Sequence, residues 1–151
     1  MKQLDEIIFD AICEDAALME YIGGRDHVVS TCFENPPAEK DNTPTPNIII
    51  TDDGFQNQSG DKDCVWESED DSVQVGVDVA ADSPKEVKML IRMVRKAVSN
   101  YIVSMHAMGE YIPELRALTS DGISWDWMKP CYYQKIVYNC VTNADIDNEQ
   151  D

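Results

Sequence analysis

The chain has 151 residues, and 43% of them are hydrophobic, so it is long enough for one core and too apolar for a disordered protein. Its 29 acidic and 12 basic residues give a formal net charge of −17, which argues against direct binding to the phosphate backbone of nucleic acid. No run of about 18 apolar residues occurs, so no membrane-spanning helix is expected. Carboxylates interrupt the apolar pattern at the N-terminus, which argues against a secretory signal and predicts a cytoplasmic protein.

The N-terminal segment is predicted to form one amphipathic helix that ends at Gly23-Gly24. Its apolar positions with helical spacing are Leu4, Ile7, Ile8, Ala11, Ile12 and Leu18. A strand from His27 to Phe33 follows. The next segment, Glu34 to Pro46, contains four prolines and several charges and is predicted to be a loop.

Two short apolar segments and two polar ones come next. Asn47 to Thr51 is predicted to be a short strand, and Asp52 to Asp63, which contains two glycines, a long loop or hairpin tip. Cys64 to Glu67 is predicted to begin a further strand. Glu67 to Asp71 holds four carboxylates in five positions, and we expect it to turn back into the strand that follows.

The clearest pattern runs from Ser72 to Met108. Valines alternate with other residues from Val73 to Val79, which is typical of a strand with one buried face. Ser83, Pro84 and Glu86 then form a helix-start signal: an N-cap, a proline at the first helical position and the acid of a capping box. The predicted helix has its apolar face at Val87, Leu90, Ile91, Val94, Val98, Tyr101, Ile102 and Met105.

The remaining segments complete the predicted fold. Gly109 to Leu118 is expected to be irregular, with a short helix from Pro113 as the alternative, and Ile123 to Trp127 and Cys131 to Thr142 are predicted strands. Residues 143–151 are predicted to be an acidic disordered tail. We therefore predict a single α+β domain over residues 1–142. Its sheet is mainly antiparallel, with an N-terminal helix and one long amphipathic helix packed on one face.

No catalytic or metal-binding constellation is recognisable, so we expect neither an enzyme nor a cofactor. His27 and His106 lack metal-like spacing, and no phosphate-binding or hydrolase motif occurs. The five cysteines form no CxxC pair and are interpreted as buried or half-buried thiols. The acids around the loop that follows Thr51 lack the spacing of a calcium site. Trp66, Trp125 and Trp127 lie in strand-like patterns, which favours the core or a subunit contact over an exposed platform.

The basic residues are concentrated in the long helix. Five of the 12 lie there, and spacings of three and four place them in one stripe: Lys85, Lys88, Arg92, Arg95 and Lys96. In an acidic protein such a stripe suggests self-association with acidic segments, here Glu67, Glu69, Asp70 and Asp71. The alternative is a solvated helix face without a partner.

The strand VQVGVDVAA, followed by SPKEVKMLIRMVRKAV, resembles the tail completion or tail terminator proteins of long-tailed bacteriophages and prophages. The similarity is one of order and spacing over Leu4 to Tyr101, and it includes the run Val94-Arg95-Lys96-Ala97-Val98. It implies a structural virion protein without catalysis. Such proteins form a ring, commonly of six subunits, which caps the tail tube and joins it to the head connector. The implied partners are therefore other copies of the chain, the tail tube and the head-connector proteins, and the implied location is the host cytoplasm and then the virion tail.

The charge leaves other interpretations open. Solubility alone could account for it, and an acidic surface could also let DNA slide past or imitate DNA. A small acidic DNA-mimic regulator or inhibitor is therefore the alternative function. It would need carboxylates spread over one rigid surface, whereas many acids of this chain fall in predicted loops and in the tail.

Overall fold

The computed structural model describes residues 4–30, 45–57, 70–109, 115–117, 122–128 and 130–143. Within them the helical elements are α1 (Leu4–Glu14), α2 (Ala16–Ile22), the short 3₁₀ helix η1 (Arg25–His27) and α3 (Pro84–Ala107). The strands are β1 (Val28–Ser30), β2 (Asn47–Asn57), β3 (Asp70–Ala81), β4 (Leu115–Ala117), β5 (Ser124–Asp126) and β6 (Cys131–Asn143). None of the helices in the described ranges is long and apolar enough to cross a membrane.

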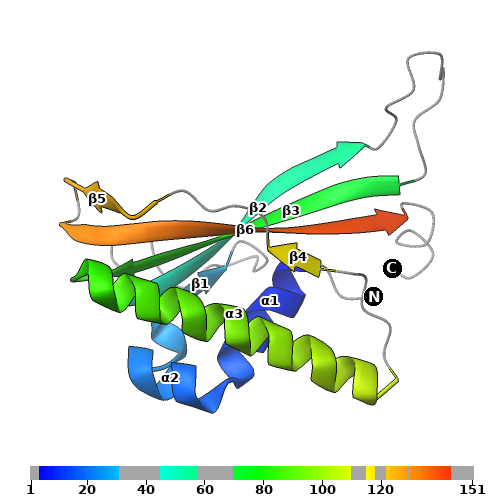
Figure 1. Ribbon diagram of the computed structural model, residues 1–151, viewed down its shortest axis with the longest axis horizontal. Helices are drawn as coiled ribbons and strands as arrows, with labels where there is room; N and C mark the ends of the chain where they lie inside the picture. The colour runs from blue at the N-terminus through cyan, green and yellow to red at the C-terminus, as the bar shows by residue number, and fades with distance from the viewer. Residues whose placement is uncertain are drawn as a thin grey trace.

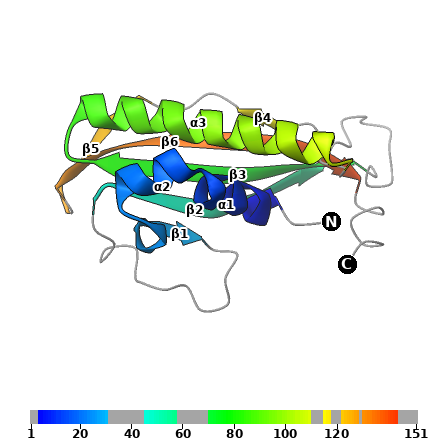
Figure 2. The same ribbon diagram turned by 90° about the horizontal axis from the view of Figure 1, so that it is seen from below.

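The strands form one six-stranded sheet in the order β1-β2-β3-β6-β4, with β5 also paired to β6. Only β1 and β2 run parallel among the described pairs, and the other pairs are antiparallel. All three α-helices lie on the same face of this sheet, and α3 runs along β3 and β6 (Figures 1 and 2). The predicted α+β class, with a mainly antiparallel sheet and helices on one face, is therefore confirmed.

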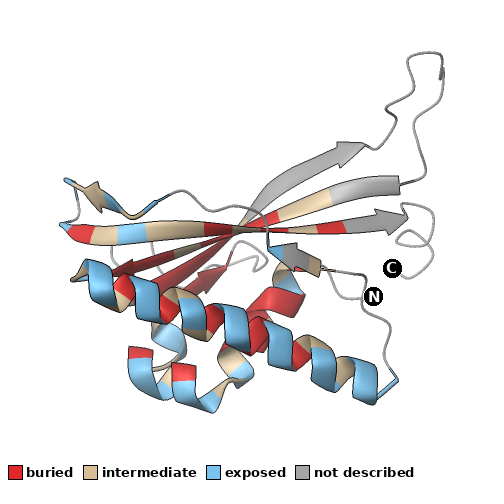
Figure 3. Cartoon of the chain, viewed as in Figure 1, coloured by how far each residue is buried: buried red, intermediate tan, exposed pale blue. Residues whose placement is uncertain are grey.

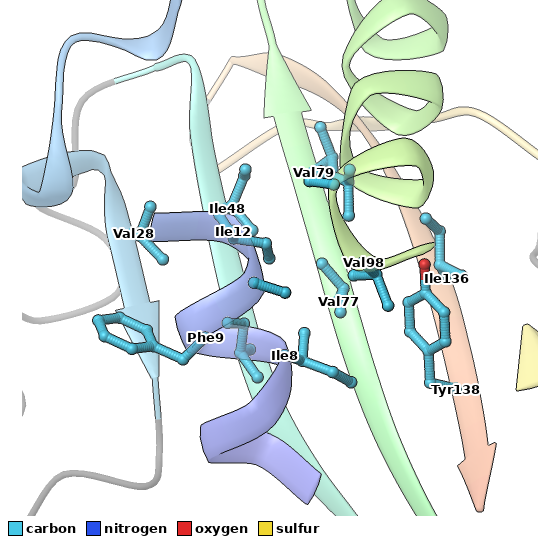
Figure 4. Packing of buried hydrophobic residues seen from close by; sticks show 14 of the residues in the cluster. Ile8, Phe9, Ile12, Val28, Ile48, Val77, Val79, Val98, Ile136 and Tyr138 are labelled. Atoms are coloured by element: carbon cyan, nitrogen blue, oxygen red, sulfur yellow. The ribbon is translucent and has the colours of Figure 1, made fainter. Parts of the chain in front are cut away.

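The core fills the space between the helices and the sheet (Figure 3). Valine alternation in β3 produces its centre, because Val75, Val77 and Val79 face the helices and are at most 1% exposed. On the neighbouring strands, Ile48 of β2 lies opposite Val79 and Ile136 of β6 lies opposite Val77 (Figure 4). From the helices come Ile8, Ile12, Leu18, Val87, Leu90, Val94 and Val98, all nearly or fully buried. One apolar cluster thus joins α1, α2, α3 and the sheet.

α3 begins at the residue that its sequence predicts. Ser83 is the N-cap, its hydroxyl accepts a hydrogen bond from the N–H of Glu86 at 3.2 Å, and Pro84 is the first helical residue. The carboxylate of Glu86 lies close enough to Tyr21 of α2 to act on its hydroxyl. Partial burial and this carboxylate raise the pKa of Tyr21 above its ordinary value.

The prediction of one N-terminal helix is wrong in one respect. The helix is interrupted at Asp15, whose Oδ1 accepts a hydrogen bond from the N–H of Leu18 at 2.9 Å and caps a new helix, α2. The predicted end is confirmed, because Gly23 closes α2 in the left-handed conformation with φ of 98°. The break lets both helices bury their apolar residues against the same cluster.

Several strand boundaries differ from the predictions. β2 continues to Asn57, where a loop was expected from Asp52, and β3 starts at Asp70, two residues before the predicted strand. Backbone pairing explains both differences, since β2 and β3 remain paired out to Asn57 and Asp71 despite a register shift between Asp52 and Phe55. Residues 52–57 and 70–72 are mostly polar, so a prediction based on the alternation of apolar residues missed this pairing.

The C-terminal half holds two further corrections. Leu115–Ala117 is strand β4, where an irregular segment or a short helix was expected, because it pairs with β6 opposite Tyr138 to Cys140. β6 also includes Asn143, so the predicted tail begins one residue too early. The prolyl segment 31–44, the predicted strand start at Cys64–Glu67 and the acidic tail from residue 144 lie outside the described residues.

Candidate subunit-contact surface

The predicted basic stripe is an exposed face of α3. Ser83 and Pro84 fix where the helix begins, and the buried residues Val87, Leu90 and Val94 fix which side faces the sheet. Spacings of three and four then turn the basic residues outward together. All five are exposed: Lys85, Lys88, Arg92, Arg95 and Lys96. They span about 16 Å of the N-terminal half of the helix at 1.5 Å per residue, along the outward side seen in Figure 3.

The predicted acidic partners lie elsewhere. Asp70 and Asp71 are the first two residues of β3, while Glu67 and Glu69 precede the described part of that strand. β3 runs from Asp71, paired with Thr142, to Ala81, paired with Tyr132, and α3 then turns back along it. Ten strand residues span about 33 Å, so the acidic start of β3 and the basic start of α3 lie at opposite ends of the molecule (Figures 1 and 2).

The structure therefore does not bring the two predicted halves of the contact together within one chain. Opposite charges at opposite ends cannot neutralise each other over this distance, because the screening length at physiological ionic strength is about 8 Å.

Beneath the stripe lies a buried tyrosine. Tyr138 of β6 is 4% exposed, points toward α3 near Val98 (Figure 4), and its hydroxyl has no hydrogen-bond partner. Burial raises its pKa to about 12, and the positive charge of Arg95 opposes that rise. The charge of Arg95 thus lies close enough to the Tyr138 hydroxyl to affect its pKa, although the Arg95 side chain is exposed.

The tryptophans gather at the end of the sheet where α3 begins. Trp125 of β5 lies opposite Tyr132 of β6, with ring centroids 4.7 Å apart, and Trp127 meets Trp125 edge-on at 6.0 Å. Trp125 is half-buried and its indole N–H has no hydrogen-bond partner. Trp127 is 84% exposed, so of the two predicted roles, core or subunit contact, a place in the core is excluded for this residue. Trp66 lies outside the described residues.

Sequence reasoning missed Met128, which follows Trp127 and is 97% exposed. The signal was present in the run Trp127-Met128-Lys129-Pro130, because a proline next to a strand marks a turn. Two large apolar side chains at a turn are expected to be exposed, whereas the same residues in a strand can be buried.

The remaining candidates have structural roles where the structure describes them. His27 lies in η1, and its Nδ1–H donates to the carbonyl of Pro46 at 2.8 Å, which ties η1 to the start of β2. Cys13 is half-buried, and Cys131 and Cys140 are buried, as predicted. In the described ranges no group of three or more His, Cys, Asp or Glu side chains is placed to hold a metal ion.

Comparison with known proteins leaves the chain without an assigned family. No family model matches the sequence, and no curated protein matches it.

Proposed function

We propose that this protein is a structural component of a bacteriophage or prophage, in which copies form a ring that caps the tail tube and joins it to the head connector. The ring would commonly hold six subunits. The role needs no catalysis and no cofactor, only surfaces that recognise a second copy, the tube and the connector.

The observation that supports this proposal most is the separation of charge along one chain. Five exposed basic side chains lie on the first half of α3, and the chain enters β3 with Asp70 and Asp71 at the other end of the strand; we take these two segments as the halves of a head-to-tail contact. Contacts of this kind close into a ring when the rotation between copies permits it, and otherwise build a filament. The order of helix, strands and long helix over Leu4 to Tyr101, which resembles the tail completion and terminator proteins, agrees with this proposal.

Energetics suggests why assembly would depend on its setting. One exposed ion pair contributes about 0–1 kcal/mol, so a single contact holds two copies only weakly. Repetition around a closed ring adds these contributions and fixes the register between copies. We therefore expect a monomer or weak oligomer in dilute solution, and rings at high concentration or on the end of a tail tube.

The test is electron microscopy of the concentrated protein, alone and with tail tubes, at rising salt. The double charge reversal Arg92→Glu and Arg95→Glu should abolish rings and tube capping while the circular dichroism spectrum stays unchanged, because both side chains are exposed. The matched control, Arg92→Lys with Arg95→Lys, keeps the charge and should assemble. If the reversed variant assembled like the parent with the same salt response, the charge-paired ring would be refuted.

The alternative, an acidic DNA mimic, gains one supporting observation. α1 and α2 contain acidic residues and no basic ones, so part of the negative charge lies on rigid helices and not in loops. If the chain is a DNA mimic, the immobilised chain should retain a DNA-binding protein, and added DNA should release it. Retention of a tail or head-connector protein that DNA does not release would instead favour the ring.

A further inference from the structure

The three α-helices form one layer on the sheet, and Figure 2 views that layer from its outer side. α3 runs along one side of the layer, and α1 and α2 run beside it in the opposite chain direction (Figures 1 and 2). The sides of the helices that face the sheet carry buried residues, such as Ile8, Leu18 and Val94. Residues on the other side of each helix therefore point outward from the layer.

Along α3 the outward positions are basic. Lys85, Arg92 and Lys96 are exposed, and they lie on the side of the helix opposite Val87 and Val94, which are fully buried. We call Lys85, Arg92 and Lys96 the basic row. Beyond its first turn the helix contains no acidic residue, so no carboxylate interrupts the basic row along α3.

The acids near the start of α3 lie outside this row. Glu86 is half-buried and lies close enough to Tyr21 of α2 to act on its hydroxyl, which puts it at the boundary between α2 and α3. Asp82 precedes the helix, and its carboxylate accepts a hydrogen bond from the hydroxyl of Thr45 at 3.0 Å. Asp126 belongs to strand β5 of the sheet and not to the helix layer.

α1 and α2 carry the opposite charge at their outward positions. Glu6 and Glu14 of α1 and Glu20 of α2 are exposed, and they lie on the sides of these helices that face away from the buried Ile8 and Leu18. Neither helix contains a basic residue. We call Glu6, Glu14 and Glu20 the acidic row. It runs beside the basic row, because α1 and α2 both contact α3 (Figure 2).

Two large hydrophobic side chains lie between the rows. Tyr21 of α2 is 43% exposed and Met89 of α3 is 39% exposed. Tyr21 is close to Glu86, and Met89 follows Glu86 by three residues, so Tyr21 and Met89 share the boundary between α2 and α3. Tyrosine and methionine are enriched in protein interfaces. Across its width the layer therefore presents basic, apolar and acidic side chains in that order.

This order is self-complementary under one kind of symmetry. Packed helices lie about 8–10 Å apart, so the two rows run side by side at about that separation. When a second copy faces the first and the two-fold axis runs along the boundary between the rows, each basic row lies over the acidic row of the other copy. The apolar boundary then meets its own copy at the axis. A two-fold axis across the rows would instead place like charges over one another.

We propose that two copies of this chain bind face to face through their helix layers, with Tyr21 and Met89 of both copies at a two-fold axis. The occupant is a second copy, because one surface offers the apolar boundary and both charges in the order that such a contact needs. The inference goes beyond the proposed function and does not rest on the tail role. The dimer covers Arg92, which the proposed ring contact also uses, so one chain cannot make both contacts at the same time.

The test reverses one row at a time and measures association by sedimentation velocity. The first variant, Arg92→Glu with Lys96→Glu, makes both rows acidic, and the second, Glu14→Lys with Glu20→Lys, makes both rows basic. All four side chains are exposed, so both variants should keep the parent's circular dichroism spectrum and melting temperature. Each variant alone should dimerise at least about 10-fold more weakly than the parent, because like charges then face each other.

Mixing the two variants tests the pairing of the rows. Every row of one variant is then complementary to every row of the other, so the mixture should form a one-to-one dimer that grows no further. The matched controls, Arg92→Lys with Lys96→Arg and Glu14→Asp with Glu20→Asp, keep the charges and should dimerise like the parent. Tyr21→Ser with Met89→Ser keeps both rows and should weaken the dimer about 10-fold, since it removes the apolar boundary.

Several results would overturn the dimer. They are a mixture of the two reversed variants that stays monomeric, a reversed variant that dimerises like the parent, and a parent that is monomeric even at about 1 mM. A parent that passes from monomer to larger rings without forming a dimer would also overturn it.

The variant Glu14→Lys with Glu20→Lys separates the dimer from the proposed function, because the charge-paired ring does not use these two residues. If this variant dimerises like the parent, the dimer is wrong and the ring is unaffected. If it no longer dimerises but still caps tail tubes, the dimer and the ring both stand. If the parent dimerises as described but never caps a tail tube, the dimer stands and the tail role fails.

Discussion

Replacing Tyr138 by phenylalanine should make this protein more stable. The Tyr138 side chain is only 4% exposed, and its hydroxyl has no hydrogen-bond partner. Leaving a buried polar group unpaired costs about 1–3 kcal/mol, because the group loses its hydrogen bonds to water. Phenylalanine keeps the ring and its packing against α3 and removes only the hydroxyl. We therefore expect the free energy of unfolding to rise by about 1–2 kcal/mol, or the melting temperature by about 2–8 °C for a chain of this length.

Urea unfolding followed by circular dichroism measures this difference. The matched control is Tyr133→Phe on the same strand, where the side chain is 37% exposed and water can solvate the hydroxyl. That variant should stay within about 0.5 kcal/mol of the parent. A Tyr138→Phe variant that is less stable by about 1 kcal/mol or more would refute the reasoning, since the hydroxyl would then have to form a hydrogen bond in the folded protein.

Alkaline pH gives the same substitution a second, independent readout. The pKa of Tyr138 is raised to about 12 from its ordinary value of 10, so the folded state favours the neutral phenol. The contribution of this pKa shift to the free energy of unfolding is fully present below pH 10, and it is lost as the pH rises through 12. Two pKa units correspond to about 2.7 kcal/mol. Between pH 10 and 12 the parent should therefore lose stability relative to Tyr138→Phe, and an unchanged difference between the two would contradict the assignment.

Three further predictions concern the core, the turn after α2 and metal binding. Leu90→Ala, at a fully buried site, should lower the free energy of unfolding by about 2–5 kcal/mol, whereas Met89→Ala beside it, 39% exposed, should lower it far less. Gly23→Ala should destabilise the protein by more than about 1 kcal/mol, because φ is 98° and the new Cβ would lie 3.1 Å from Nε2 of His27. Gly24 also has positive φ, but nothing lies within 4 Å of the place of its Cβ. Gly24→Ala in the same denaturant assay therefore measures the backbone strain without the contact. Elemental analysis of the purified protein should find no stoichiometric metal, and tightly bound zinc would contradict this.

The fold was predictable where local pattern and tertiary contact agree. Val73 to Val79 alternate because one face of β3 meets the helices, and Ser83-Pro84 begins α3 by local chemistry alone, so the sequence contains both signals. The break at Asp15 was missed because Leu18 stands where a capping box would have a glutamate or glutamine. β4 was missed because its three residues have no pattern of their own and are strand only through pairing with β6.

The candidate surface also has features that the sequence predicts and features that depend on the fold. Exposure of Lys85 to Lys96 follows from helix periodicity, and the structure confirms it for all five basic residues. That Asp70 and Asp71 lie at the other end follows from the direction in which β3 enters the sheet, which composition does not encode. The exposure of Trp127 depends on β5 ending at Asp126, one residue earlier than its alternation suggests.

The place of β6 in the sheet has a consequence for synthesis of the protein. β6 is the last described strand in chain order, yet it lies between β3 and β4, and it supplies Ile136 and Tyr138 to the surface that α3 covers. Until residues 131–143 have been made, one edge of β3 has no partner along its twelve residues and half of the docking surface of α3 is missing. An unpaired edge of that length is a template for aggregation. Chains that end before Cys131 should therefore aggregate, whereas chains that include β6 should not.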